Sequence, residues 1–160
     1  MCASQVIPAV LGGPLAGVGH REDGEGEMSN VAVVREVYAA FARRDMEAIL
    51  EHLSPDVVWS EPDNPFNPAA GVRRGHAGFL EWARIGREAE DVEVLEPRLF
   101  LTSEDAVAVV GHMKCRAKRT GRAFESDFVH VLRFRDGTIT AFQEFFDTYA
   151  AGEAFRTQGV

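Results

Sequence analysis

The sequence predicts an α+β domain in which a curved antiparallel sheet wraps around N-terminal helices packed on its inner face. Apolar residues at helical spacing dominate the first part of the patterned region, up to about residue 89. From there to residue 147, strand-like segments alternate with short turn sequences, as in a run of antiparallel hairpins. The length of 160 residues fits one domain with a single core.

Two amphipathic helices are predicted to open this region. The first has an apolar stripe with spacings of three and four, made of Val33, Val34, Val37, Tyr38 and Phe41. Ser29 or Asn30 is suited to cap its N-terminus, and Asp45 is suited to cap a second, short helix. The segment Ser54-Pro55-Asp56 predicts the end of that second helix.

One strand and a third helix are expected next. Residues 57–61 form a short β-rich run that is closed by Pro62 and a loop containing two further prolines. The third helix is predicted from near Gly75 to about Ala89.

Four strands and a short last helix complete the predicted order. The strands are expected at residues 92–102, 106–118, 122–134 and 138–147. Short turn sequences, such as Thr120-Gly121 and Asp136-Gly137, separate them. The last helix is expected at 148–156, with Asp147 as its cap.

The composition favours a small-molecule ligand over a polyanionic partner. Seventeen basic against 25 acidic residues give a net charge of -8, so neither nucleic acid nor an anionic membrane is expected to bind. Two cysteines, Cys2 and Cys115, form neither a disulfide framework nor a zinc motif, and no apolar run approaches membrane-spanning length. We therefore expect a cytoplasmic protein without a metal or other cofactor.

The chain divides into a tail and one domain. Residues 1–27 are rich in Gly, Pro and Ala and end in an acidic stretch, a composition that predicts a disordered tail. The folded domain is expected over 28–156, with a short C-terminal tail at 157–160.

Alternation along the strand at 122–134 assigns its two faces. The inward set is Phe124, Ser126, Phe128, His130, Leu132 and Phe134. A two-residue turn at Thr120-Gly121 would make paired residue numbers sum to 241. Gly111, Met113 and Cys115 would then face inward, and His112 outward.

The turn at Asp136-Gly137 leaves two registers open. A three-residue loop that includes Arg135, with Gly137 in a left-handed bulge, turns Phe142, Glu144 and Phe146 inward beside His130. A two-residue loop turns Ala141, Gln143, Phe145 and Asp147 inward instead. We favour the three-residue loop, because it brings two large Phe side chains into the core.

Under that choice, three titratable groups meet in one apolar interior: Glu61, His130 and Glu144. Burial among aromatic rings raises the pKa of a carboxyl group toward the range useful for general acid or base catalysis, and a nearby imidazole exchanges protons near neutrality. We expect the interior to be lined by Trp59, Phe66, Phe79, Trp82, Phe100, Met113, Phe128, Phe142 and Phe146.

The order and spacing of four segments resemble one family. These segments are Val37–Asp45, Leu53–Trp59, Arg74–His76 and Val131–Ile139, and together they are similar to the SnoaL-like branch of the nuclear transport factor 2 superfamily. The resemblance implies a cystatin-like, cone-shaped α+β barrel with an apolar pocket. It also implies a homodimer, and its members include ketosteroid isomerases, polyketide cyclases, epoxide hydrolases, dehydratases and noncatalytic binders.

The resemblance also implies roles for single residues. Glu61, before Pro62, is similar to the general-base aspartate of ketosteroid isomerases. His130 stands where isomerases and polyketide cyclases have an acid/base aspartate. Glu144 resembles the acid/base glutamate of phenazine-biosynthesis condensing proteins. Val37 occupies the place of the isomerases' oxyanion tyrosine, with Tyr38 one residue away, which argues against a true steroid isomerase.

These features lead to two hypotheses. The first is a cofactor-independent acid/base enzyme, an isomerase, cyclase or dehydratase, for a small apolar carbonyl metabolite. In it Glu61 or Glu144 moves a proton while His130 donates a hydrogen bond or shuttles the proton. Epoxide hydrolysis is possible with the same three residues. The second is a noncatalytic dimeric small-molecule-binding protein, whose interior would be filled by Phe and whose polar groups would be paired.

Overall fold

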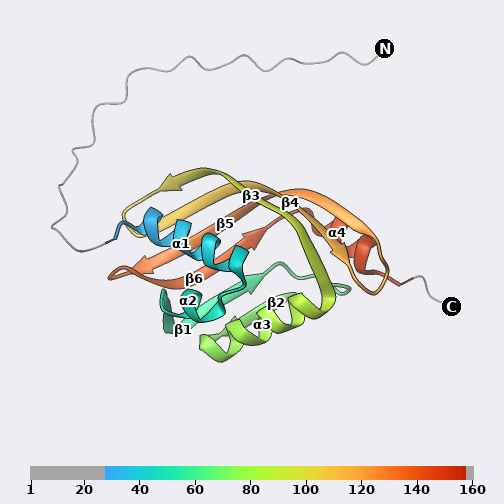
Figure 1. Ribbon diagram of the computed structural model, residues 1–160, viewed down its shortest axis with the longest axis horizontal. Coiled ribbons are helices and arrows are strands. Elements are labelled where there is room, and N and C mark those ends of the chain that lie inside the picture. The colour runs from blue at the N-terminus through green and yellow to red at the C-terminus, as the bar shows by residue number, and fades with distance from the viewer. Residues whose placement is uncertain (1–27, 158–160) are drawn as a thin grey trace, which may run out of the picture.

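The structure analysed is a computed structural model that describes residues 28–157 (Figure 1). The tail predicted at residues 1–27 and the last three residues lie outside this part of the chain. The element order within it is that of an α+β fold, as the sequence predicts.

Four helices form in the described range, and side chains cap three of them. They are α1 (Asn30–Arg43), α2 (Met46–Leu50), α3 (Gly75–Ala89) and α4 (Thr148–Phe155). The side chains of Ser29, Asp45 and Asp147 accept hydrogen bonds from the first turns of α1, α2 and α4, which confirms these predicted caps. None of the helices in the described range is long and apolar enough to cross a membrane.

Six strands form one curved sheet with the order β2-β1-β6-β5-β4-β3. The strands are β1 (Leu53–Glu61), β2 (Gly71–Arg74), β3 (Glu90–Thr102), β4 (Ala106–Ala117), β5 (Ala123–Arg135) and β6 (Thr138–Phe145). Their neighbours run antiparallel except β1 and β6, which pair in parallel. The sheet stays open, with β2 and β3 at its edges.

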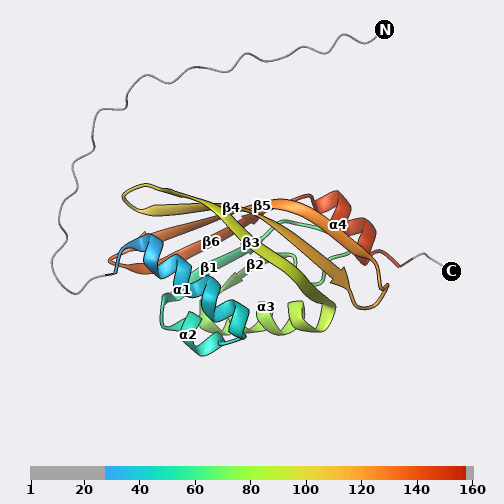
Figure 2. The same ribbon diagram turned by 45° about the horizontal axis from the view of Figure 1, so that its top comes forward.

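Helices α1, α2 and α3 lie on the concave side of the sheet, and α4 lies near its far end (Figure 2). The core fills the space between these layers. Phe79 of α3, Val34 of α1 and Phe128 of β5 are almost completely buried there. The interior that holds the candidate site is therefore bounded by the sheet and by two helices.

Two features of β1 and β2 differ from the sequence prediction. Ser54-Pro55-Asp56 does not merely end a helix, because α2 ends at Leu50 and β1 already begins at Leu53. The pairing of β1 with β6 shifts register between Leu53 and Val58, and this irregularity includes the proline. Strand β2 is only four residues long, too short for alternation to reveal it.

The β4–β5 connection is longer than predicted. Residues 118–122 connect the two strands, and paired residue numbers sum to 239, as in Val109 with His130. Gly121 has φ +72° within this loop, a conformation that favours glycine. The shift of two residues preserves the predicted faces, and His112 lies on the outer face beside Asp127.

The β5–β6 connection is a two-residue turn, so the three-residue loop is wrong. Asp136 and Gly137 have φ values of 50° and 74°, as the tight hairpin turn requires. The register then shifts between the pairs Phe134–Ile139 and Arg133–Ala141, which leaves Thr140 as an extra residue in β6. This bulge restores the inward positions of Phe142 and Glu144 that the other loop would have produced.

Gly111 provides a test of the close packing inside the sheet. An added Cβ would lie 2.4 Å from the backbone oxygen of Glu96 and 2.4 Å from Cζ of Phe128. We expect Gly111→Ala to lower the free energy of unfolding by about 2 kcal/mol or more, since both neighbours would have to move. Urea unfolding of the purified variant measures this change.

Gly86→Ala is the matched control for that substitution. Gly86 lies in α3, and nothing lies within 4 Å of a Cβ added there. The control should be stabilised by roughly 0.5–1 kcal/mol, because alanine favours the helix. Equal unfolding free energies for Gly111→Ala and the wild type would contradict the packing described here.

Candidate functional site

His130 is bonded through both of its ring nitrogens. Its Nδ1 lies 2.5 Å from Oη of Tyr38, and its Nε2 lies 2.9 Å from Oε1 of Glu144. Tyr38 comes from α1, His130 from β5 and Glu144 from β6, directly opposite His130 in the sheet. The β6 bulge is what places Glu144 in this position.

Aromatic rings enclose the imidazole. Phe128 stacks on it with 4.1 Å between ring centroids, and Tyr38 lies nearly parallel to it at 5.9 Å. Phe142 meets it edge-on at 5.0 Å. The ring is thereby held in one orientation, and no nitrogen remains free to contact a ligand directly.

Glu61 forms a second polar cluster at the end of β1. Its Oε1 accepts a hydrogen bond from Asn67 Nδ2 at 2.8 Å, and its Oε2 accepts one from Trp82 Nε1 at 2.5 Å. Burial and then the charge of Glu144 raise its pKa to about 7, although the two hydrogen bonds and Arg73 act in the opposite direction. Glu61 can therefore hold or release a proton near neutral pH.

The loop after β1 supports this carboxyl group. Asn67 Oδ1 accepts a hydrogen bond from the backbone of Ala69, which fixes the amide that reaches Glu61. Arg73 donates to the backbone oxygens of Ala69 and Ala70. Asn67 is a site residue that sequence reasoning missed, because the prolines around it indicate only a loop.

A third carboxyl group, Glu90, shares this environment. Burial, followed by the charges of Glu61 and Glu144, raises its pKa to about 8, while a hydrogen bond from Cys115 partly opposes the shift. Burial, followed by the charges of Glu90, Glu144 and Glu61, raises the pKa of the Cys115 thiol. Glu90 was missed because the strand was predicted to begin at Val92. A strand predicted to begin at residue 90 would have included the Glu90 side chain in the alternation between the two faces.

Most of the predicted lining residues surround these groups. Trp59 stacks on Phe142 with 4.0 Å between centroids and contacts Phe79 and Trp82. Phe100 meets Tyr38 edge-on, and Met113 and Phe128 are buried. Phe146 packs near Phe124 against the core.

Phe66 lies elsewhere. It is 43% exposed on the loop between β1 and β2, with the guanidinium of Arg156 above its ring. The Asn64 side chain accepts a hydrogen bond from the backbone of Phe66, and this local turn directs the ring away from the interior.

The polar groups keep limited contact with solvent. The side chains of His130 and Glu144 are 8% and 11% exposed, whereas Val107 and Val109 on β4 are fully buried. Oε2 of Glu144 has no hydrogen-bond partner among residues 28–157 and is not enclosed. This oxygen therefore keeps unused hydrogen-bonding capacity. Within the same range, no three His, Cys, Asp or Glu side chains are grouped so as to hold a metal ion.

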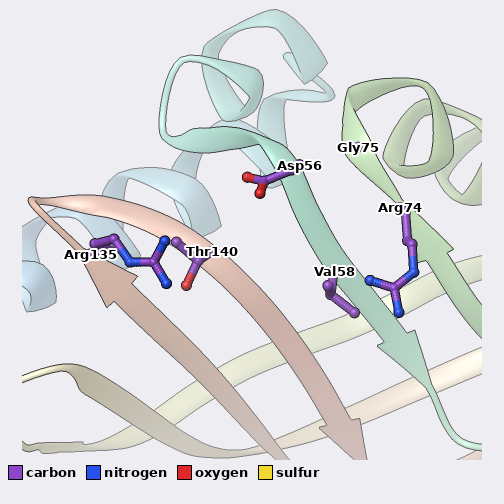
Figure 3. A pocket seen from close by; sticks show the side chains of 6 residues that line it. All are labelled: Asp56, Val58, Arg74, Gly75, Arg135 and Thr140. Carbon is purple, nitrogen blue, oxygen red and sulfur yellow. The ribbon is translucent and has the colours of Figure 1, made fainter.

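A separate hollow of about 540 Å³ lies on the outer side of the sheet (Figure 3). Its lining residues are Asp56, Val58, Arg74, Gly75, Arg135 and Thr140. It contains none of the three predicted catalytic residues, which lie on the opposite face.

Comparison with known proteins identifies relatives of this architecture. An NTF2-like protein from Burkholderia xenovorans LB400 is 32% identical, with a TM-score of 0.74, and the match covers 83% of this chain and 100% of that one. TerC, whose structure contains co-crystallised polyporic acid, is 32% identical with a TM-score of 0.71, over 80% of this chain and 98% of its own.

Sequence comparison agrees with the structural neighbours. An uncharacterized protein of Mycobacterium tuberculosis H37Rv is 28% identical over 132 residues, which are 79% of this chain and 95% of the relative. The family model of the SnoaL-like domain matches residues 34–142. With this match over more than half of its length, the chain belongs to the SnoaL-like domain family, within the NTF2-like superfamily.

Proposed function

We propose that this protein is a cofactor-independent acid/base enzyme that acts on a small, largely apolar carbonyl compound, as an isomerase, a cyclase or a dehydratase. The observation that carries this proposal is the pair of glutamates, Glu61 and Glu144, that face one aromatic interior with different partners. Two carboxyl groups in unlike environments can divide the roles of acid and base.

In this proposal Glu144 is the base. His130 donates to its Oε1, and its Oε2 is free to take a proton from the carbon next to the substrate carbonyl. His130 supports the carboxylate and does not contact the substrate oxygen, which revises the role expected from the sequence. The reason is that both of its nitrogens are already bonded.

Glu61 is the acid. Its raised pKa leaves a substantial protonated fraction at neutral pH. As Glu144 takes the proton, the C–H electron pair forms the enolate double bond, and Glu61 gives its proton to the carbonyl oxygen. Isomerisation, aldol-type cyclisation and dehydration all begin with this step.

One structural relative supports a small-molecule ligand. TerC, at 32% identity, was crystallised with polyporic acid, a small organic molecule. The chain offers apolar rings and buried carboxyl groups in the corresponding fold, which suits a ligand that is mostly apolar with a polar reacting group.

Proton abstraction can be tested before the natural substrate is known. Indanone and cyclohexenone in deuterated buffer should exchange their α-protons faster with the wild-type protein than with buffer alone. We expect Glu144→Gln to slow this catalysed exchange by roughly 10²–10⁴-fold, since the amide cannot act as a base. Mass spectrometry of the ketone measures the incorporation.

Glu88→Gln is the matched control. Glu88 is an exposed glutamate on α3, paired with Arg84, so its replacement should leave the exchange rate unchanged. Saturable binding of these ketones without exchange would contradict the enzyme proposal and favour the dimeric binding protein. Exchange that survives in Glu144→Gln would exclude Glu144 as the base.

The raised pKa of Glu61 predicts a pH-dependent stability. Between about pH 4.5 and about pH 7, this carboxyl group is ionised in the unfolded chain but protonated in the folded one. The free energy of unfolding of the wild type should therefore fall relative to Glu61→Gln as pH rises through this window, by about 3 kcal/mol in total, and level off above it. Urea unfolding of both proteins at several pH values tests this. A constant difference across the window would show that Glu61 is not protonated as required.

We also propose that the protein is a homodimer that pairs through the outer face of the sheet. Val129 and Val131 lie on this face of β5, and Phe145, opposite Val129 on β6, is 49% exposed. Leu99 and Leu101 on β3 are also about half exposed. A second copy would cover these side chains.

Sedimentation analysis tests the dimer. The wild type should sediment as a dimer, and Phe145→Lys should sediment as a monomer because a charge would be buried in the interface. Leu80→Lys is the control, since Leu80 is similarly exposed, at 42%, but lies on α3, on the other side of the sheet. A monomeric wild type would overturn this proposal.

A further inference from the structure

Tyr38 contacts the candidate site through one hydrogen bond that joins distant parts of the chain. Its hydroxyl lies 2.5 Å from Nδ1 of His130, although the two residues are 92 positions apart. Glu144 is 2.9 Å from the other nitrogen of the same ring. The three side chains therefore form a continuous phenol–imidazole–carboxylate chain.

The hydrogen-bond inventory limits where the imidazole proton can lie. A carboxylate only accepts hydrogen bonds, whereas a phenol can donate one. If Tyr38 donates to Nδ1, the proton of a neutral ring lies on Nε2 and is directed at Glu144. If instead Nδ1 donates to Tyr38, two states are left: an imidazolium that also donates to Glu144 from Nε2, or a neutral ring whose Nε2 lone pair faces Glu144, which must then be protonated for a hydrogen bond to remain.

The surroundings of Tyr38 favour the first arrangement. Burial and the charge of Glu144 hold the pKa of the Tyr38 hydroxyl well above its usual range, so the phenol keeps its proton and remains a donor. The imidazole cannot readily turn over to exchange its two nitrogens, because Phe128 stacks on its face, Phe142 meets it edge-on, and Tyr38 and Glu144 hold its two nitrogens.

We propose that Tyr38 is a positioning residue. Its hydroxyl donates a hydrogen bond to Nδ1 of His130, and this keeps the ring proton on Nε2, directed at Glu144. Nε2–H then donates to Oε1 of Glu144, and Oε2 is left to face the substrate. This inference rests on the proposed role of Glu144 as the base. In serine hydrolases an aspartate fixes the histidine tautomer in a comparable way, and there a wrong tautomer costs most of the activity.

The test is the protonation state of His130, which can be observed without a substrate. Long-range proton–nitrogen NMR of histidine-labelled protein reports separately on Nδ1 and Nε2. In the wild type at neutral pH we expect an unprotonated, hydrogen-bonded Nδ1 and a protonated Nε2. In Tyr38→Phe the Nδ1 signal should move toward the protonated position, because the phenol that occupied its lone pair is gone.

Tyr149→Phe is the matched control. Tyr149 is the other tyrosine of the chain and is 78% exposed on α4, so the same chemical change there should leave the His130 signals in place. Urea unfolding of both variants confirms that they are folded. An Nδ1 that stays unprotonated in Tyr38→Phe, with the proton still on Nε2, would overturn the inference.

A kinetic measurement separates this inference from the proposed function. If ketone exchange occurs, Tyr38→Phe should lower kcat by at least about tenfold with little change in KM, as expected for a residue that acts through the base. An unchanged kcat would also overturn the inference. A shifted Nδ1 signal in a protein that catalyses no exchange would support the coupling of Tyr38 to His130 while rejecting the enzyme proposal.

Discussion

The extra residue in β6 determines which side chains the interior contains. After the tight turn at Asp136-Gly137, the strands pair so that Ile139 faces inward opposite Phe134. Without the bulge at Thr140, alternation would continue with Gln143 and Phe145 facing inward and Glu144 facing solvent. With it, Glu144 lies opposite His130, and Phe145 joins the outer face. One inserted residue thus supplies both the carboxylate of the site and an apolar residue of the proposed interface.

The interior concentrates acidic groups where their charges are costly. Glu61, Glu90 and Glu144 all lie near enough to influence one another, and burial raises the pKa values of the first two. Of these three, Glu144 alone has an imidazole beside it. The aromatic walls therefore affect how Glu61 and Glu90 hold protons, because burial among them favours the neutral carboxyl group and strengthens each hydrogen bond relative to water.

Local patterns in the sequence predicted much of this fold. The caps at Ser29, Asp45 and Asp147 follow from short side chains beside helical stripes, and alternation assigned His130 to the inner face. The inward position of Glu144 was predicted through the wrong turn, because a bulge later in the strand has no clear residue signature. The bond between Tyr38 and His130 depends on how α1 lies across the sheet, which no local pattern encodes. The burial of Glu90 depended on where a strand begins, and strand ends are weakly specified by alternation.

The parallel pairing of β1 with β6 also bears on how the protein folds. Leu53 pairs with Ile139, 86 residues later, so β1 cannot take its place between β2 and β6 until β6 has been synthesised. Such distant contacts carry a large loop-closure entropy and slow folding relative to the local hairpins formed by β3 to β6. The hairpins can therefore form first, with His130 and Glu144 already opposite each other. Docking of β1 against β6 would then follow. This step would place Glu61 in the interior that already contains His130 and Glu144.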